Sequence, residues 1–208
     1  MTTPLMTAAV AHIAAADANF ATFLETAPPC ELDTPFHESD FETLVFAVVG
    51  QQISAKAADS ITLRVLKHTG RPLTAEKVLE VGFDGLRECG FTRAKARTVT
   101  EVAQAVITGD LDFSMLSKMS DDEAISYLTR FWGIGHWTSH MLMIFRLSRL
   151  DIWPTGDLGV RKGWAIIHHQ SSVPTAQEME HVADQLSPYR SVAAWYCWVA
   201  TRENSLFW

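Results

Sequence analysis

The sequence predicts an all-α fold, and three observations support this prediction. Apolar residues recur at intervals of three and four in one segment after another, which is the period of a helix with one buried face. Residues that can cap a helix N-terminus precede most of these segments, and glycine or proline follows most of them. No segment shows the strict apolar–polar alternation of a half-buried strand.

The N-terminal part of the chain predicts two helices of different character. An alanine-rich segment predicts one helix from Thr7 to Leu24, and the prolines after it indicate an extended connector that includes Pro35. The segment from Phe41 to Val49 is strongly apolar, so we predict a helix with a broad buried face that Gly50 interrupts.

Capping residues and stop signals set the limits of the remaining helices. In the middle of the chain these are Ser54 to Gly70, Thr74 to Val81, Asp84 to Gly90 and Thr92 to Ile107. In the second half they are Ser120 to Arg130, Trp137 to Leu147, Asp157 to His169, Thr175 to Leu186 and Arg190 to Arg202. Ser120 with Glu123, and Thr175 with Glu178, have the spacing of capping boxes.

Length and composition indicate a globular protein. A chain of 208 residues can bury a real core. No run of 18 apolar residues exists, so we expect no membrane span, and the N-terminus lacks the positive leading region of a signal peptide. The three cysteines are odd in number and far apart, which indicates a reducing, cytoplasmic compartment without a disulfide framework.

The net charge of −7 is unfavourable for a nucleic-acid-binding protein, but the acids are unevenly distributed. Seven of the 24 acids, and no Lys or Arg, lie in the segment up to Glu42, so the rest of the chain holds 17 acids and 17 bases. We expect the acidic segment to lie away from any nucleic acid. A neutral remainder predicts modest affinity with weak counterion release.

The turn Gly133-Ile134-Gly135 lies between two predicted helices and is the strongest local signal in the chain. Glycine is favoured in turns that need positive φ, so Gly-x-Gly alone indicates little. The first turn of the helix after it leaves backbone N–H groups without intrahelical acceptors, and such groups can bind a phosphate. A single carboxylate, Asp157, follows about twenty residues after Trp137.

These residues carry a family resemblance. The segments Phe131 to Thr138, FWGIGHWT, and Pro154 to Gly159, PTGDLG, resemble the helix-hairpin-helix DNA glycosylases, and within them the DNA-3-methyladenine glycosylase II family of alkylation repair. The similarity extends from about Phe41 to Trp198. It implies a two-lobed all-α domain with the active-site cleft between the lobes: one lobe of about residues 41–150, the other of about 1–40 plus 151–208.

The resemblance makes Asp157 the candidate catalytic residue. Cleavage of an N-glycosidic bond builds positive charge on the sugar, and a fixed carboxylate stabilises that charge and can orient or deprotonate the attacking water. Taken alone, Gly-Asp-Leu more simply predicts a helix N-cap, and the two roles are compatible. Bifunctional relatives carry a lysine nucleophile two residues after the hairpin, where this chain has Trp137. The resemblance therefore implies a monofunctional hydrolase that leaves an abasic site.

Four residues are implied to line the pocket for the flipped base: Trp137, Trp198, Gln51 and Met141. Tryptophan walls suit a cationic alkylated base through stacking and cation–π attraction. An aromatic residue on an amphipathic helix is more simply explained as core. Met141 departs from the tyrosine common in the family. Gln52 takes the position of the residue that enters the duplex when a base is flipped out; a polar loop is the simpler explanation.

The resemblance also implies contacts to DNA phosphates from the hairpin and from two basic clusters. The candidates are Gly133, Gly135, His136, Thr138, Arg93, Lys95 and Arg161. The simpler alternative for the basic residues is a solvated helix face. Family hairpins often bind a monovalent cation through main-chain carbonyls, here those of Phe131 and Ile134. We expect no other cofactor, because the eight histidines show no metal-ligand spacing.

We therefore expect a glycosylase of base excision repair that releases 3-methyladenine and 7-methylguanine-type bases from double-stranded DNA. The expected protein is a monomer, cytoplasmic, and associated with the nucleoid if bacterial. Two alternatives stay open: a non-catalytic helix-hairpin-helix module that binds DNA without needing Asp157, and a sister glycosylase for a different damaged base. The absent lysine argues against the bifunctional branch that acts on oxidised bases. Three scattered cysteines cannot form the four-cysteine iron–sulfur centre of some relatives, which argues against the branches for mismatches and pyrimidine lesions.

Overall fold

The computed structural model describes residues 3–33 and 38–201, and these residues contain helices and no β-strand. This confirms the prediction of an all-α fold. The described residues form two compact units: residues 3–33 with 148–201, which we call the terminal unit, and residues 38–147, which we call the central unit. Pro35 of the predicted connector and Arg202 of the predicted last helix lie outside the described residues.

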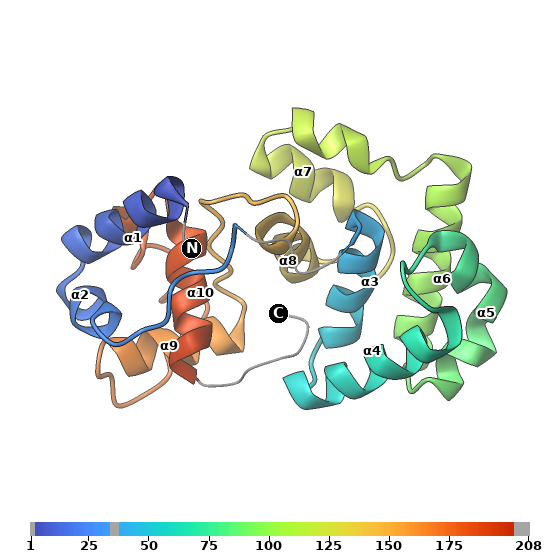
Figure 1. Ribbon diagram of the computed structural model, residues 1–208, viewed down its shortest axis with the longest axis horizontal. Helices are drawn as coiled ribbons and strands as arrows, with labels where there is room; N and C mark the ends of the chain where they lie inside the picture. The colour runs from blue at the N-terminus through green and yellow to red at the C-terminus, as the bar shows by residue number, and fades with distance from the viewer. Residues whose placement is uncertain (1–2, 34–37, 202–208) are drawn as a thin grey trace. The chain divides into compact units, whose positions relative to one another are not determined.

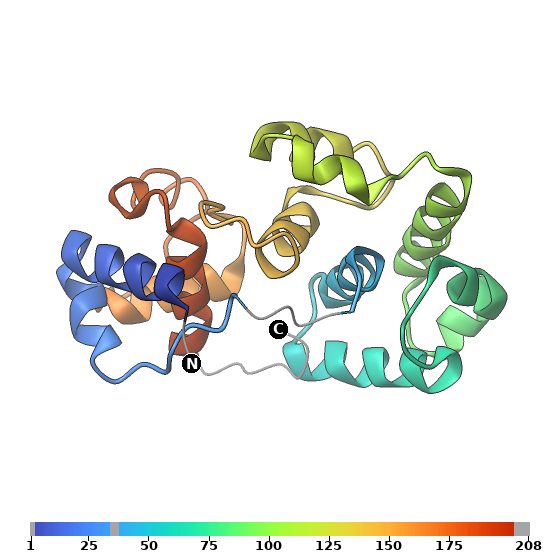
Figure 2. The same ribbon diagram turned by 45° about the horizontal axis from the view of Figure 1, so that its top comes forward.

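The central unit is built around α3 (Asp40–Gly50). Every side chain from Phe41 to Val49 is buried, the polar Glu42 and Thr43 included, so this helix is enclosed on all sides. In Figures 1 and 2, α3 lies between α8 (His136–Phe145) and α6 (Arg93–Thr108), and it contacts both. The other elements of this unit are α4 (Ala55–Thr69), α5 (Ala75–Glu88), η1 (Phe113–Lys118) and α7 (Asp121–Leu128).

The terminal unit combines the two ends of the chain around α10 (Arg190–Thr201). The run from Ser191 to Cys197 is buried, and α10 packs mainly on α9 (Leu158–Ile167) and also touches α1 (Pro4–Ala16) (Figure 1). The remaining elements are α2 (Ala18–Leu24), which packs on α1 and α9, and the short η2 (Asp184–Leu186). No helix among the described residues has the length and apolar character needed to cross a bilayer.

The capping residues set the helix limits as predicted. Ser54, Thr74, Thr92 and Ser120 each accept a hydrogen bond from a backbone N–H in the first turn of the helix that follows. The capping box of Ser120 and Glu123 is complete. Gly82, with a φ of 69°, interrupts α5 between the two predicted helices of this region. The sequence did not predict η1, whose first turn is capped by Asp112.

The prediction of one helix from Thr7 to Leu24 was wrong. The chain forms two helices that meet at Asp17, which is extended, with φ −141° and ψ 116°. The carboxylate of Asp17 accepts hydrogen bonds from the backbone N–H groups of Asn19 and Phe20 and so starts a new helix. An aspartate can compete for backbone donors in this way, and the periodicity of the apolar residues does not reveal it.

The prediction of a helix from Thr175 to Leu186 was also wrong. Thr175 and Glu178 form the predicted capping contacts, but turns and the short η2 follow instead of an α-helix. The indole N–H of Trp153 donates to the carbonyl of Met179 at 2.8 Å. In an α-helix that carbonyl would accept from the N–H of Ala183. A tertiary contact therefore replaces the local hydrogen bond.

Asp17 also links α1 and α2 to α9. Its carboxylate lies 3.0 Å from Nε2 of His168, whose ring stacks on Trp164 at a centroid distance of 3.8 Å. Burial opposes ionisation of Asp17, but the hydrogen bonds from His168 and from the N–H groups of Phe20 and Asn19 outweigh it and hold the pKa of this carboxyl below its usual value. The folded protein therefore favours the ionised carboxylate.

We predict that Asp17→Asn lowers the free energy of unfolding at pH 7 by about 1.5 kcal/mol, because the caps persist while the charged partner of His168 is lost. Since the folded pKa is lowered, the stabilisation is complete above the unfolded pKa of about 3.9 and is lost as the pH falls through the folded pKa. Urea unfolding of both proteins at pH 7 and at pH 3 measures this. An equal difference at the two pH values would contradict it.

Candidate active site

Asp157 lies at the N-terminus of α9, at the end of the loop that begins after α8. It is the N-cap of α9, and its Oδ1 accepts a hydrogen bond from the backbone N–H of Val160 at 2.7 Å. The residue is only 8% exposed. The capping role that Gly-Asp-Leu suggests is therefore present, and it fixes the direction of the carboxylate.

Trp198 holds the same carboxylate from α10. Its indole Nε1–H donates to Oδ1 of Asp157 at 2.9 Å, so two donors from two helices meet on one oxygen. The structure thus brings together two of the predicted site residues that are 41 positions apart in the sequence. Trp198 is half-exposed. Its hydrogen bond to Asp157 is a contact that the predicted role as a wall of the base pocket does not require.

Two glycines of α9 allow this arrangement, and sequence reasoning gave them no role. A Cβ on Gly159 would lie 2.8 Å from Cδ1 of Trp198 and 3.0 Å from Oδ1 of Asp157. A Cβ on Gly163, one helical turn further on, would overlap the main-chain carbonyl of Cys197. Both glycines therefore let α10 approach α9 closely enough for Trp198 to reach Asp157. The spacing Gly-x-x-x-Gly was the signal that could have revealed this contact.

A second acid in this loop, Asp151, has a structural role. It accepts hydrogen bonds from Nε and Nη2 of Arg190 at 2.8 and 2.9 Å and from the hydroxyl of Ser187 at 2.8 Å. Burial opposes its ionisation, but these donors outweigh burial and hold the pKa of Asp151 below its usual value. The loop that leads to Asp157 is therefore fixed to the start of α10.

The hairpin between α7 and α8 has the backbone that its glycines predict. Gly133 has a φ of 79°, and a Cβ there would overlap Oγ1 of Thr98 on α6, so only glycine fits without strain. The N–H of Ile134 donates to the carbonyl of Phe131 at 3.1 Å. Gly135 is the N-cap of α8 and gives no side-chain cap, so no side chain of the cap residue covers the first turn of α8.

Gln51 supports this hairpin. Its Nε2 donates to the carbonyl of Gly133 at 3.0 Å and to the hydroxyl of Thr138 at 2.8 Å. The contact was not predicted, because Gln51 lies 82 positions from Gly133 and 87 positions from Thr138 in the sequence. The roles of Gln51 in a base pocket and of Thr138 at a phosphate stay predictions, and Thr138 is buried in this structure.

The prediction that Lys95 reaches a phosphate does not fit the structure. Lys95 is 8% exposed, and its Nζ donates to the carbonyls of Val49 and Gln51, both at 2.7 Å. Burial lowers the pKa of its ammonium group. The ammonium therefore serves the end of α3 and is not directed to solvent. A cluster of basic residues in a sequence does not reveal which member turns inward.

The other candidates occupy a range of environments. Arg93 is exposed at the start of α6, whereas Nη1 of the half-buried Arg161 donates to the carbonyl of Pro174 at 3.1 Å. Gln52 is exposed, Trp137 is half-buried and Met141 is buried. Their assigned roles stay predictions.

His136 is exposed at the start of α8, one turn before His140. Burial, together with the neighbouring His136, lowers the pKa of His140 to about 4, so this second ring is neutral at pH 7. A contact from His136 to a phosphate stays a prediction.

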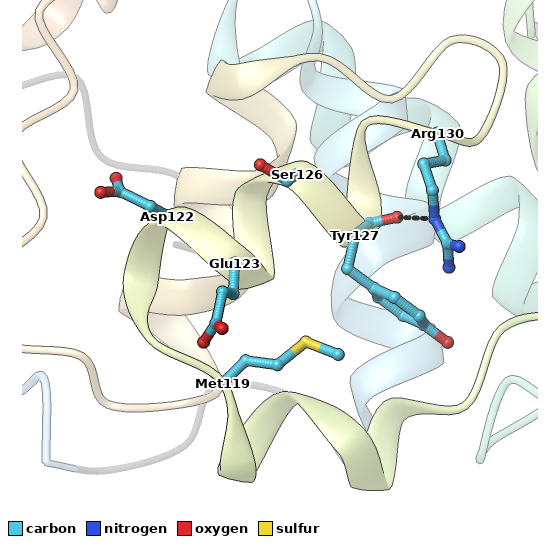
Figure 3. A pocket seen from close by; sticks show the side chains of 6 residues that line it. All are labelled: Met119, Asp122, Glu123, Ser126, Tyr127 and Arg130. Carbon is cyan, nitrogen blue, oxygen red and sulfur yellow. Dashed lines mark hydrogen bonds between the residues drawn. The ribbon is translucent and has the colours of Figure 1, made fainter.

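A pocket on α7 contains none of the predicted site residues (Figure 3). It is lined by Met119, Asp122, Glu123, Ser126, Tyr127 and Arg130. Glu123 is engaged in the capping box with Ser120, and the guanidinium of Arg130 lies 4.4 Å from the centre of the Tyr127 ring. Among the described residues, no group of three His, Cys, Asp or Glu side chains is arranged to hold a metal ion.

Comparisons with known proteins give consistent results. Residues 45–188 match the family described as HhH-GPD superfamily base excision DNA repair protein. DNA-3-methyladenine glycosylase 1 of Schizosaccharomyces pombe is 34% identical over 165 residues, which cover 78% of this chain and 72% of that protein. The alkylbase DNA glycosidase-like protein mag2 of the same yeast is 29% identical over 90% of both chains.

Solved structures show the same fold. The structure of the Schizosaccharomyces pombe 3-methyladenine DNA glycosylase in complex with abasic DNA has a TM-score of 0.80 and 30% identity, and the match covers 91% of this chain and 94% of that one. A DNA-3-methyladenine glycosidase from Bacillus halodurans has a TM-score of 0.75 and 32% identity, over 95% of this chain and 92% of that one.

Proposed function

Because this chain belongs to the HhH-GPD superfamily of base excision DNA repair proteins, we propose that it is a glycosylase that releases alkylated bases from double-stranded DNA. The substrates are 3-methyladenine and 7-methylguanine-type lesions, and the product is an abasic site. The observation that carries this proposal is the buried carboxylate of Asp157, held on one oxygen by Val160 and Trp198. We propose that the protein is cytoplasmic, and that it is associated with the nucleoid if the source is bacterial.

The reaction requires little from the protein beyond one carboxylate. An alkylated purine carries a positive charge, so the C1′–N bond can break with both electrons going to the base, which leaves neutral. The sugar is left with positive charge at C1′, which the carboxylate of Asp157 stabilises. Water then adds to C1′ and gives up a proton, either to the carboxylate or to solvent. No strong acid is needed for the leaving base.

The hairpin offers backbone donors for the DNA. Gly135 leaves the first turn of α8 without a side-chain cap, and the positive end of a helix dipole favours a phosphate there. Glycines at 133 and 135 let a strand come close to the backbone. We also propose a monovalent cation at the carbonyls of Phe131 and Ile134. A carbonyl oxygen has two lone pairs, so the Phe131 oxygen that accepts from Ile134 can also bind a cation.

The direct test is base release from methylated duplex DNA. Incubation with the protein is expected to release 3-methyladenine and 7-methylguanine, measured by chromatography with mass spectrometry, while unmethylated duplex releases nothing. Binding to the duplex without release would indicate a non-catalytic DNA-binding module. Release from duplexes that carry an oxidised or deaminated base, and none from methylated DNA, would indicate a sister glycosylase.

We further propose that the enzyme has no lyase activity. A strand-cleaving glycosylase forms a Schiff base between a lysine amine and C1′, and the hairpin position for that lysine holds Trp137, whose indole is not a nucleophile. Borohydride added during turnover is therefore expected to trap no covalent protein–DNA adduct. A trapped adduct, with nicking of the abasic strand, would refute this part of the proposal.

A further inference from the structure

The turn that follows α3 is held by a buried ammonium group. Nζ of Lys95, near the start of α6, donates to the carbonyls of Val49 and Gln51 at the end of α3. The last carbonyls of a helix have no intrahelical donors, so this lysine satisfies acceptors that would otherwise be buried without partners. Its positive charge also lies at the negative end of the α3 dipole.

The next residue, Gln52, has an unusual backbone. Its φ is 55°, and Gln51 before it has φ −53° and ψ 124°; these three angles are close to those of a type II turn. Glycine is the residue usually found at the second central position of such a turn, because a side chain there is strained. The exposed Gln52 keeps a side chain at a position where glycine would fit with less strain. Backbone outliers of this kind are frequent at functional sites, which is consistent with the role at the duplex that the family resemblance implies for Gln52.

The same turn is held from a second side. The side chain of Gln51 donates to the carbonyl of Gly133 and the hydroxyl of Thr138, which joins the turn to the hairpin. Lys95 binds main-chain carbonyls on the N-terminal side of the turn, and the Gln51 side chain fixes the position of the turn relative to the hairpin. Thr98 of α6 in turn lies against Gly133. The backbone of Gln52 is thus determined by its neighbours and not by its own local preference.

We propose that Lys95 is a positioning residue whose two carbonyl contacts set the direction in which Gln52 projects into the duplex beside a flipped base. This inference rests on the proposed glycosylase function. An ammonium group has three donors, so one side chain can serve both carbonyls, whereas methionine, an apolar side chain of similar length, has no donor. Lys95 acts on the reaction through Gln52 and does not touch the substrate.

A double-mutant cycle tests the proposal. We would measure single-turnover base release from methylated duplex DNA for the wild type, Lys95→Met, Gln52→Ala and the double variant. Lys95→Met is expected to slow release about 10- to 100-fold, the usual scale for a misplaced contact remote from the chemistry. In the double variant it is expected to add little to the loss caused by Gln52→Ala, because coupled residues are not additive.

Lys77→Met is the matched control. Nζ of this half-buried lysine on α5 donates to the carbonyl of Pro72 at 2.7 Å, so the change removes the same charge and a similar contact away from the turn. Its release rate is expected to stay within about twofold of the wild type, as is usual for surface changes. The melting temperature of every variant is measured by thermal unfolding, and base release is then assayed below the lowest of these temperatures. Lys95→Gln keeps two N–H donors on a shorter, neutral side chain and replaces Lys95→Met if the latter does not fold.

The outcomes separate the two proposals. If the wild type releases no base, the proposed function fails. If the wild type is active and Lys95→Met slows release by the same factor with and without the Gln52 side chain, Lys95 only stabilises the fold and this inference fails. The inference also fails if Lys95→Met releases base as fast as the wild type.

Discussion

Replacing Asp157 with asparagine is expected to slow base release at least about 100-fold while the protein stays folded. Asparagine has the same shape and is an equally good N-cap, so its side-chain oxygen can still accept from Val160 and Trp198. What it lacks is the negative charge that stabilises the developing positive charge on the sugar. The measurement is single-turnover release of methylated bases, together with thermal unfolding.

Two companion variants separate charge from structure. Asp157→Ala removes both the charge and the cap, so it is expected to lose activity and also about 1 kcal/mol of stability. Asp184→Asn removes one charge elsewhere in the terminal unit, where the exposed Asp184 lies 3.2 Å from the exposed His181, and should leave the rate unchanged. If Asp157→Asn released bases at the wild-type rate, the catalytic role of Asp157 would be excluded.

Replacing Gly163 with alanine is expected to have the largest effect on stability. The new methyl group would overlap the main-chain carbonyl of Cys197, and backbone cannot move aside as a flexible side chain can. Overpacking of this kind costs about 3 kcal/mol, which exceeds the gain of roughly 1 kcal/mol in helix propensity. The net loss is about 2 kcal/mol, so for a protein of this size we expect the melting temperature to fall by about 4–8 °C.

The loss should extend to activity, because separating α9 from α10 withdraws the indole of Trp198 from Asp157. Gly156→Ala is the control for stability: a Cβ there meets no atom within 4 Å, so the melting temperature should stay within about 2 °C of the wild type. Differential scanning calorimetry of the three proteins measures the melting temperatures, and single-turnover release of methylated bases measures the activity. A Gly163→Ala protein as stable as the wild type would show that the α9–α10 contact can spread without cost.

The sequence predicted the helix limits where a serine or threonine hydroxyl caps the first turn. Ser54 and Thr92 cap helices because each hydroxyl reaches a backbone N–H within the next turn. The helix breaks at Asp17, and the turns after Thr175, were missed because carboxylate capping and the indole of Trp153 compete with helix formation. The Asp17 cap is a side-chain contact and the Trp153 contact is a tertiary one, and the periodicity of apolar residues reveals neither.

The candidate site shows the same division. The sequence predicted the tight turn of the hairpin from its glycines, and the family resemblance singled out the carboxylate of Asp157 and the absence of a lysine at position 137. The tertiary structure decided that Trp198 donates to Asp157, that Gln51 supports the hairpin and that Lys95 turns inward to α3. Hydrogen bonds between residues 41 to 87 positions apart depend on how helices pack, and packing is a property of the whole chain rather than of any segment in it.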